Sequence, residues 1–192
     1  MPTVHLVGVY DASFDAAQAA AEQYQTRAFA TLEELLPHVR AATIAVPTVF
    51  HSSVGELLMR AGVHCLIEKP LAKDVADARH IAAIAKETGV TVQVGHIERF
   101  NPAFEELVKR PICPKFIEAE RHGPFTGRSV DIGAVLDLMI HDLDLASHLV
   151  GGAYVTPDLL YDRDGDGDAD EHWVADATTG RVEAAPRRVA FT

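Results

Sequence analysis

Short apolar runs alternate with longer segments of helical periodicity over the first half of the chain. The short runs are rich in Val, Ile and Leu and are bounded by Gly, Pro or polar residues, a pattern typical of buried strands. The longer segments place apolar residues three and four positions apart, as helices do when one face is packed. We predict strands at residues 4–10, 42–46, 63–67 and 90–94, and helices at residues 16–24, 51–62 and 75–88, with another beginning at residue 31.

Capping and breaking residues lie at the ends of these segments. Thr31, with Glu34 three positions later, forms a capping box, and Asp15 is placed to cap the helix that follows it. Pro47 ends one strand, and Gly89 ends one helix. Strands that alternate with helices in this way predict an α/β fold with a parallel, doubly wound sheet.

The pattern changes beyond residue 100. An exposed strand is predicted at residues 116–120, and an apolar helical run follows from Asp137 to about Val150, as expected where an α+β domain begins. Residues 151–192 carry nine acidic and four basic side chains, a net charge of −5, so this segment should be extended and solvated. Domain boundaries are therefore expected near residues 100 and 152.

Composition narrows the class of protein. The net charge of −11 argues against a nucleic-acid partner, whose phosphates need a basic surface. No apolar run reaches the roughly 18 residues of a membrane span, and the first residues do not follow the order of a secretory signal. Cys65 and Cys113 lack the spacing of a disulfide framework and fit a reducing compartment. We expect a cytoplasmic protein with no membrane partner.

Lys69 stands at the carboxyl end of the apolar strand predicted at residues 63–67. In open α/β sheets ligands bind at this edge, where a partly buried ammonium group can act as an acid or base. The alternative is a surface lysine that opens the loop before Pro70 and has no chemical role.

Asp137 and His141 are four positions apart in the apolar helical run, so both side chains project from one face of a helix. An Asp that holds one ring nitrogen of a His leaves the other nitrogen to move a proton. Two other interpretations stay open: a half-buried His satisfied by the preceding carboxylate, or a metal site that adds Asp144 or His148. No Cys/His cluster of zinc-like spacing supports the metal site, and we predict none.

The acidic run that begins at Asp162 places carboxylates at alternate positions before Gly167, as a calcium-binding loop does. The twelfth position of such a loop needs a bidentate Glu, and Trp173 stands there. A segment altered by truncation, a frame change or gene decay is favoured over a calcium-binding protein.

Three motifs occur in order: Glu68-Lys69-Pro70, then Gly95-His96-Ile97-Glu98-Arg99-Phe100-Asn101-Pro102, then Asp137-x-x-x-His141. Over about residues 3–150 the chain resembles the Gfo/Idh/MocA family of nicotinamide-dependent sugar and cyclitol dehydrogenases, whose EKP and D-x-x-x-H signatures these residues match. The second and third motifs are also similar to those of members that oxidise the sugar 3-hydroxyl of UDP-N-acetylglucosamine.

The resemblance implies a fold and a chemistry. Residues 1–100 would form a Rossmann-type dinucleotide-binding domain, residues 101–152 the start of a substrate domain, and residues 153–192 an acidic tail that is disordered or aberrant. The implied activity is oxidation of a hydroxyl of a sugar or nucleotide sugar, in which a hydride passes from the carbinol carbon to NAD(P), with NAD favoured over NADP. A homo-oligomer is left open.

By the same resemblance, His141 is the favoured acid/base, Asp137 orients it, and Lys69 polarises or holds the substrate hydroxyl. The residues expected to contact the cofactor are Asp11, Pro47, Thr48, His51, Glu68, Lys69 and His96. The residues expected to contact an anionic or polyhydroxylated substrate are Arg99, Asn101 and Arg128.

The 192 residues contain no G-x-G-x-x-G motif. If the strand at residues 4–10 is the second strand of the Rossmann domain, Asp11 at its end would bond the adenosine ribose. The first βα unit would then be lacking, and the doubly wound sheet would be incomplete at its centre, between the strands at 4–10 and 42–46. The alternative for Asp11 is a cap on the next helix, and the competing interpretation of the chain is a non-catalytic remnant or interaction module.

Overall fold

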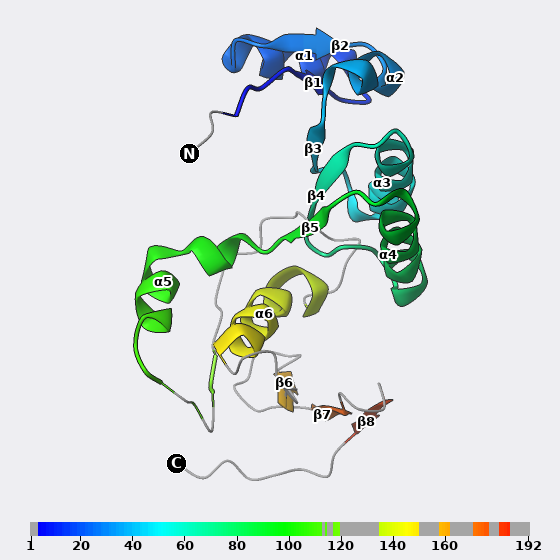
Figure 1. Ribbon diagram of the computed structural model, residues 1–192. Helices are drawn as coiled ribbons and strands as arrows, with labels where there is room; N and C mark the ends of the chain where they lie inside the picture. Colours follow the sequence, from blue (N-terminus) through cyan, green and yellow to red (C-terminus); the bar gives the residue numbers. More distant parts are fainter. Residues whose placement is uncertain are drawn as a thin grey trace. The chain divides into compact units, whose positions relative to one another are not determined.

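The computed structural model describes residues 4–112, 114, 117–119, 135–149, 158–161, 171–176 and 181–184. The chain divides into two compact units, Met1–Gly95 and His96–Thr192 (Figure 1). The first unit alternates strands and helices, so the prediction of an α/β fold is confirmed.

The predicted elements of the first unit begin and end within two residues of their predicted positions, except that β1 begins at Gly8 instead of Val4. In chain order they are β1 (Gly8–Tyr10), α1 (Phe14–Gln23), β2 (Arg27–Phe29), α2 (Leu32–Leu35), the 3-10 turn η1 (Leu36–His38), β3 (Ala41–Ile44), the 3-10 turn η2 (Thr48–Phe50), α3 (His51–Arg60), β4 (His64–Glu68), α4 (Val75–Thr88) and β5 (Val92–Gly95). Strand β2 was not predicted, because three residues that begin with a charged Arg form no apolar run.

The helix ends test the predicted caps. Thr31 accepts a hydrogen bond from the Glu34 N–H at 3.2 Å, as predicted. Gly89 ends α4 with a φ of +70°, a left-handed conformation that glycine adopts without strain. The prediction for Asp15 is wrong, since Ser13 is the N-cap of α1 and Asp15 lies in its first turn. A carboxylate there is favoured by the helix dipole, which explains its position without a capping role.

The parallel strands of the first unit form two hydrogen-bonded groups. Strand β1 pairs with β2, and β3, β4 and β5 pair in that order. Within the described residues no ladder joins β1 to β3. In the Rossmann order 3-2-1-4-5-6, strands β2, β1, β3, β4 and β5 take positions 3, 2, 4, 5 and 6. The pairing therefore agrees with a Rossmann-type sheet that is incomplete between β1 and β3.

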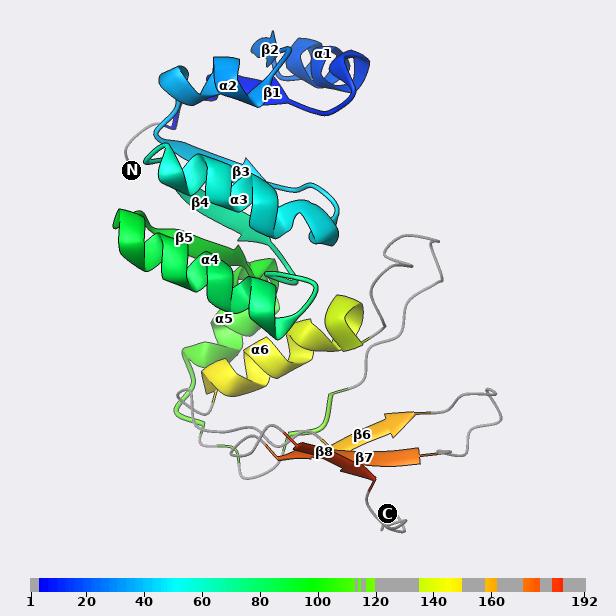
Figure 2. The ribbon, with the colours of Figure 1, turned by 90° about the vertical axis from the view of Figure 1, so that its right-hand side faces the viewer.

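The core of the first unit lies between the β3–β5 sheet and helices α3 and α4. Figure 2 shows these helices side by side on one face of that sheet. The buried cluster includes Met59 from α3, Ile67 from β4, and Ile81 and Ile84 from α4. This packing holds β4 in place, and the motif that contains Lys69 follows β4 directly.

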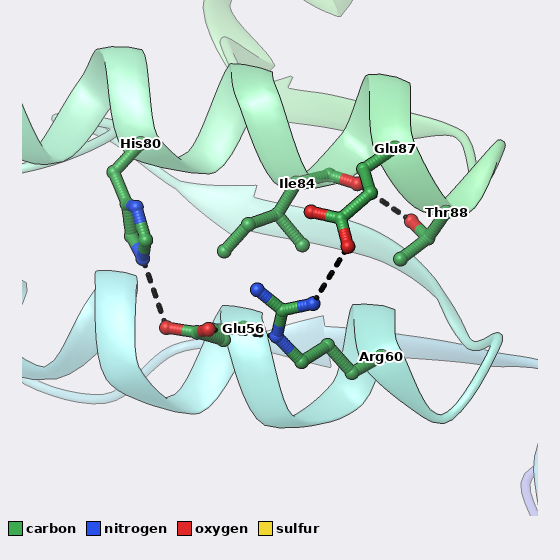
Figure 3. Close-up of polar contacts among 6 residues, drawn as sticks. All are labelled: Glu56, Arg60, His80, Ile84, Glu87 and Thr88. Carbon is green, nitrogen blue, oxygen red and sulfur yellow. Dashed lines mark hydrogen bonds and ion pairs between the residues drawn. The ribbon is translucent and has the colours of Figure 1, made fainter.

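Charged side chains link α3 to α4 at the surface (Figure 3). Glu56 accepts a hydrogen bond from Arg60 Nε at 2.7 Å, and its other oxygen lies 2.8 Å from His80 Nε2. Arg60 also donates to Glu87, with 3.1 Å between Nη1 and Oε1. The hydrogen bonds from His80 and Arg60 lower the pKa of Glu56 below its ordinary value. Because these side chains are largely exposed to solvent, the ion pairs contribute little to the stability of the unit.

The second unit contains short helices and an antiparallel sheet. Its elements are the 3-10 turn η3 (Ile97–Phe100), α5 (Pro102–Val108), the π-helical turn η4 (Val135–Met139), α6 (Ile140–Leu149), β6 (Asp158–Tyr161), β7 (Glu171–Asp176) and β8 (Arg181–Ala184). Strand β7 pairs with both β6 and β8. The strand predicted at residues 116–120 is wrong over residues 117–119, which are irregular.

The prediction of an unstructured acidic segment is wrong over β6 and β7. The net charge of residues 151–192 is an average that conceals short runs of strand-forming residues, such as Leu159-Leu160-Tyr161 and Trp173-Val174. The calcium interpretation depended on the acidic run that begins at Asp162. Residues 162–170 of this run lie outside the described residues.

Candidate functional site

Lys69 directly follows β4, as predicted, and Glu68 is the last residue of that strand. Both side chains are half-buried. Glu68 pairs with Gly95 of β5, where an added Cβ would lie 3.1 Å from the Glu68 carboxyl atoms. Gly95 therefore lets the Glu68 carboxylate lie close against the backbone of β5. The Lys69–Pro70 peptide bond is cis.

Pro47, Thr48 and His51 follow β3 at the same edge of the parallel sheet. Pro47 is exposed and Thr48 is buried. The His51 ring is also buried, with Nε2 2.9 Å from the Val46 carbonyl oxygen and Nδ1 2.9 Å from the Pro70 carbonyl oxygen. As placed, the ring offers no nitrogen to a cofactor, so the sequence-based role of His51 as a direct contact has no support in this arrangement.

Asp11 follows β1 and is exposed. Its Oδ1 accepts a hydrogen bond from the Ser13 N–H at 2.8 Å, and Ser13 in turn caps α1. One carboxylate oxygen thus takes part in the turn that leads into the helix, which was the alternative interpretation of this residue. A contact to a ribose through the other oxygen stays a prediction.

Asp137 and His141 lie where a π-helical turn runs into an α-helix. Asp137 belongs to η4, His141 is the second residue of α6, and both side chains are half-buried. The sequence predicted a single α-helix, whereas the structure begins with a wider turn of i→i+5 type. Turns of this type occur often at functional sites, because they offset side chains from the regular helical positions.

Asp144 on α6 is the centre of a charged cluster with Arg99 and His96. Arg99 donates to both carboxylate oxygens, from Nε to Oδ2 at 2.7 Å and from Nη2 to Oδ1. The His96 Nε2 lies 3.8 Å from Asp144 Oδ1, and the His96 Nδ1 is buried with no hydrogen-bond partner among the described residues. Burial opposes ionisation of Asp144, but the Arg99 hydrogen bonds and the nearby positive charges outweigh it and lower the pKa of that carboxyl.

The remaining predicted substrate contacts differ in their surroundings. Asn101 is the N-cap of α5 and accepts a hydrogen bond from the Ala103 N–H at 3.0 Å, so helix capping occupies its Oδ1. Arg128 lies outside the described residues. In the part of the chain that the structure describes, no group of three or more His, Cys, Asp or Glu side chains is placed to hold a metal ion. No helix in that part is long and apolar enough to cross a membrane.

Parallel strands that alternate with helices, with Asp11 after β1, are an arrangement typical of dinucleotide-binding domains. A family model described as an oxidoreductase family with an NAD-binding Rossmann fold matches residues 1–96. The chain belongs to this family, Gfo/Idh/MocA.

Two similar proteins of known sequence are named as dehydrogenases. The chain is 43% identical over 147 residues to UDP-N-acetylglucosamine 3-dehydrogenase of Acidithiobacillus ferrooxidans, a match that covers 76% of this chain and 47% of that protein. It is 30% identical over 142 residues to scyllo-inositol 2-dehydrogenase (NAD(+)) of Bacillus subtilis, covering 68% of this chain and 40% of the relative. The chain thus spans about half the length of the curated relatives it matches.

Solved structures extend the similarity to the fold. The structure of UDP-N-acetylglucosamine 3-dehydrogenase GnnA from Acidithiobacillus ferrooxidans superposes with a TM-score of 0.76 and 38% identity, over 93% of this chain and 60% of that one. GenD2 from gentamicin A biosynthesis, in complex with NAD, gives a TM-score of 0.68 and 25% identity, over 95% of this chain and 58% of that one.

Proposed function

We propose that the chain carries the nucleotide-binding edge and the catalytic helix of an NAD-dependent dehydrogenase that oxidises a hydroxyl of a sugar or nucleotide sugar. The observation that carries the proposal is the family match over residues 1–96, with Lys69 directly after β4. The 43% identity to a UDP-N-acetylglucosamine 3-dehydrogenase supports a nucleotide sugar as substrate. The structure of WlbA from Bordetella pertussis with NADH and UDP-GlcNAcA, 31% identical with a TM-score of 0.50 over 54% of this chain and 30% of that one, supports the same class.

The residues at the strand ends fit a dinucleotide. The Asp11 carboxylate can accept hydrogen bonds from ribose hydroxyls and would repel the additional phosphate of NADP, which favours NAD. Pro47, Thr48 and Glu68 would lie along the bound cofactor. The buried Nδ1 of His96 is a polar atom that a ligand could satisfy. NAD, when bound, supplies the acceptor for the hydride.

Side chains of this chain remove the proton of the substrate hydroxyl and stabilise the charge that results. His141 removes it, and Asp137 orients the imidazole and stabilises its charged form. The Lys69 ammonium donates to the same hydroxyl oxygen and stabilises the negative charge that develops there. Arg99, Asn101 and Arg128 would contact the polar groups of the substrate.

The test supplies a glycine-rich phosphate-binding loop, because the 192 residues contain no G-x-G-x-x-G motif. A chimera would place a strand, a glycine-rich turn and a helix of Rossmann type before residue 4. We expect it to bind NADH, measured by nicotinamide fluorescence, and to form NADH from NAD with UDP-N-acetylglucosamine.

Variants of the chimera provide the control. Lys69→Met and His141→Asn should each retain NADH binding and lose turnover by about 10² or more, the usual effect of removing an acid or base. A folded chimera that binds no NADH, or variants that turn over as fast as the parent, would refute the proposal.

A further inference from the structure

His51 joins two loops that follow neighbouring strands. Its ring lies between the carbonyl oxygen of Val46, two residues after β3, and the carbonyl oxygen of Pro70, two residues after β4, at 2.9 Å from each. His51 is 1% exposed, so bulk water does not reach either contact. A carbonyl oxygen only accepts hydrogen bonds, so a ring nitrogen that bonds to either carbonyl must be the donor. A neutral ring donates to one carbonyl, and a doubly protonated ring donates to both.

The packing of α3 explains why the ring reaches both loops. His51, Gly55 and Met59 are four residues apart and share the buried face of the helix. At Gly55 the helix lies against the sheet, since an added Cβ would be in ordinary contact with Ile67 Cδ1 at 3.5 Å and Ile44 Cδ1 at 3.8 Å. The first residue of the helix is thereby brought in between the two loop backbones.

We infer that His51 is a positioning residue that holds the backbone at Pro70 against the end of β3 and thereby places Lys69. The Pro70 carbonyl belongs to the residue directly after Lys69, so its position limits where the Lys69 side chain can begin. The chemical meaning of this placement rests on the proposed function, in which Lys69 acts on the substrate hydroxyl. The two contacts of the His51 ring with the loop carbonyls belong to the 192-residue chain itself, so their effect on Lys69 can be measured without turnover.

Four variants distinguish positioning of the Pro70 backbone by His51 from a simple contribution of the ring to core packing. His51→Phe keeps a ring of similar shape and donates nothing. His51→Asn keeps an N–H donor near the position of Nδ1, toward Pro70, and His51→Gln keeps one near Nε2, toward Val46. Ile81→Val is the matched control, because Ile81 is equally buried in the same core and is not a partner of either carbonyl.

The readout is the rate at which Lys69 reacts with an amine-acylating reagent, measured by mass spectrometry against Lys86 of α4 as an internal reference. We expect His51→Phe to raise the relative rate about fivefold, the population change that corresponds to losing one buried hydrogen bond. His51→Asn should restore the rate more fully than His51→Gln, and Ile81→Val should leave it unchanged. A structural role alone would move the rate equally in Ile81→Val and in His51→Phe.

Nuclear magnetic resonance of the unaltered chain gives a second measurement, should His51→Phe fail to fold. We expect a slowly exchanging ring N–H signal from His51 and amide shifts in His51→Asn that concentrate at residues 46–48 and 69–72. An exposed, rapidly exchanging ring, equal labelling in the Asn and Gln variants, or shifts no larger than those of Ile81→Val would overturn the inference. Absence of NADH binding by the chimera would refute the proposed function and leave these outcomes unaffected.

Discussion

Replacing Gly8 with alanine should weaken the pairing of β1 with β2, because the site has no room for a methyl group. A Cβ at Gly8 would lie 2.3 Å from Phe29 Cε2 and 2.6 Å from the carbonyl oxygen of Arg27. Carbon atoms pack at about 3.5–4.0 Å, so the first contact overlaps by more than an ångström. To remove the overlap, either the Phe29 ring must move or the backbone of β1 or β2 must shift.

Neither neighbour of Gly8 can move cheaply. Phe29 is 1% exposed, the Arg27 guanidinium lies over its ring at 4.3 Å, and the His38 ring lies 5.6 Å away between centroids. The Arg27 backbone belongs to the β1–β2 pairing, in register with Gly8. Overpacking of a well-filled site costs about 1–3 kcal/mol, and the double clash places Gly8→Ala at about 3 kcal/mol of lost unfolding free energy.

The same substitution at Gly55 is the control. There the Cβ would meet Ile67, Met59 and Ile44 at 3.5 to 3.8 Å, which is ordinary contact, and the position lies inside α3. Alanine in a helix interior is favoured over glycine by about 0.5–1 kcal/mol, so Gly55→Ala should stabilise the chain. Urea unfolding followed by circular dichroism measures both variants. If Gly8→Ala leaves the free energy of unfolding unchanged, or raises it as Gly55→Ala should, the described pairing of β1 with β2 is incorrect.

Three further predictions concern single side chains. Burial raises the pKa of the Cys65 thiol to about 11, so at pH 8 Cys65 should resist maleimide in the native chain and react once urea unfolds it; rapid native labelling in a Cys113→Ser background would contradict this. Because the pKa of Asp144 is lowered in the folded chain, its stabilising effect is present above the unfolded value of about 4 and disappears as the pH falls through the folded value. Asp144→Asn should therefore cost about 1 kcal/mol at pH 7, a small value because Arg99 is half exposed, and the difference from the parent should narrow below pH 4 in urea unfolding curves. A difference that is constant with pH would show that the pair with Arg99 does not form. The chimera with the added strand, glycine-rich turn and helix should bind NADH more tightly than the 192-residue chain by fluorescence titration; micromolar binding by the shorter chain would show that β1 is not the second Rossmann strand.

Much of the first unit could be predicted because its signals are local. The apolar runs at β3, β4 and β5 and the helical periodicity of α3 and α4 reflect burial against neighbours, and that burial is encoded in each segment separately. The motifs around Lys69 and Asp137 are also contiguous in the sequence. By contrast, β2 is short and begins with Arg27, and α5 was missed although Asn101 supplies its cap.

The contacts that define the site's details could not be predicted in this way. Arg99 and Asp144 are separated by 45 positions, and either charge alone is typical of an exposed surface. The partners of His51 are backbone carbonyls, which every residue carries and which leave no mark in the sequence. Such contacts depend on which helices and strands lie next to each other in the fold. A single sequence does not show these neighbours directly.

The unjoined edges of β1 and β3 affect how the first unit opens. Since no described ladder crosses from β1 to β3, β1 and β2 can separate from β3–β5 without breaking a strand hydrogen bond. Among the described residues, Leu32 and Leu36 link the two parts through side-chain packing. Native-state amide hydrogen exchange should then resolve two cooperative foldons, with the β1–β2 amides exchanging at a lower opening free energy than those of β4. A strand bonded to both edges would merge these foldons, so a strand added in the chimera should also make the whole sheet unfold as one.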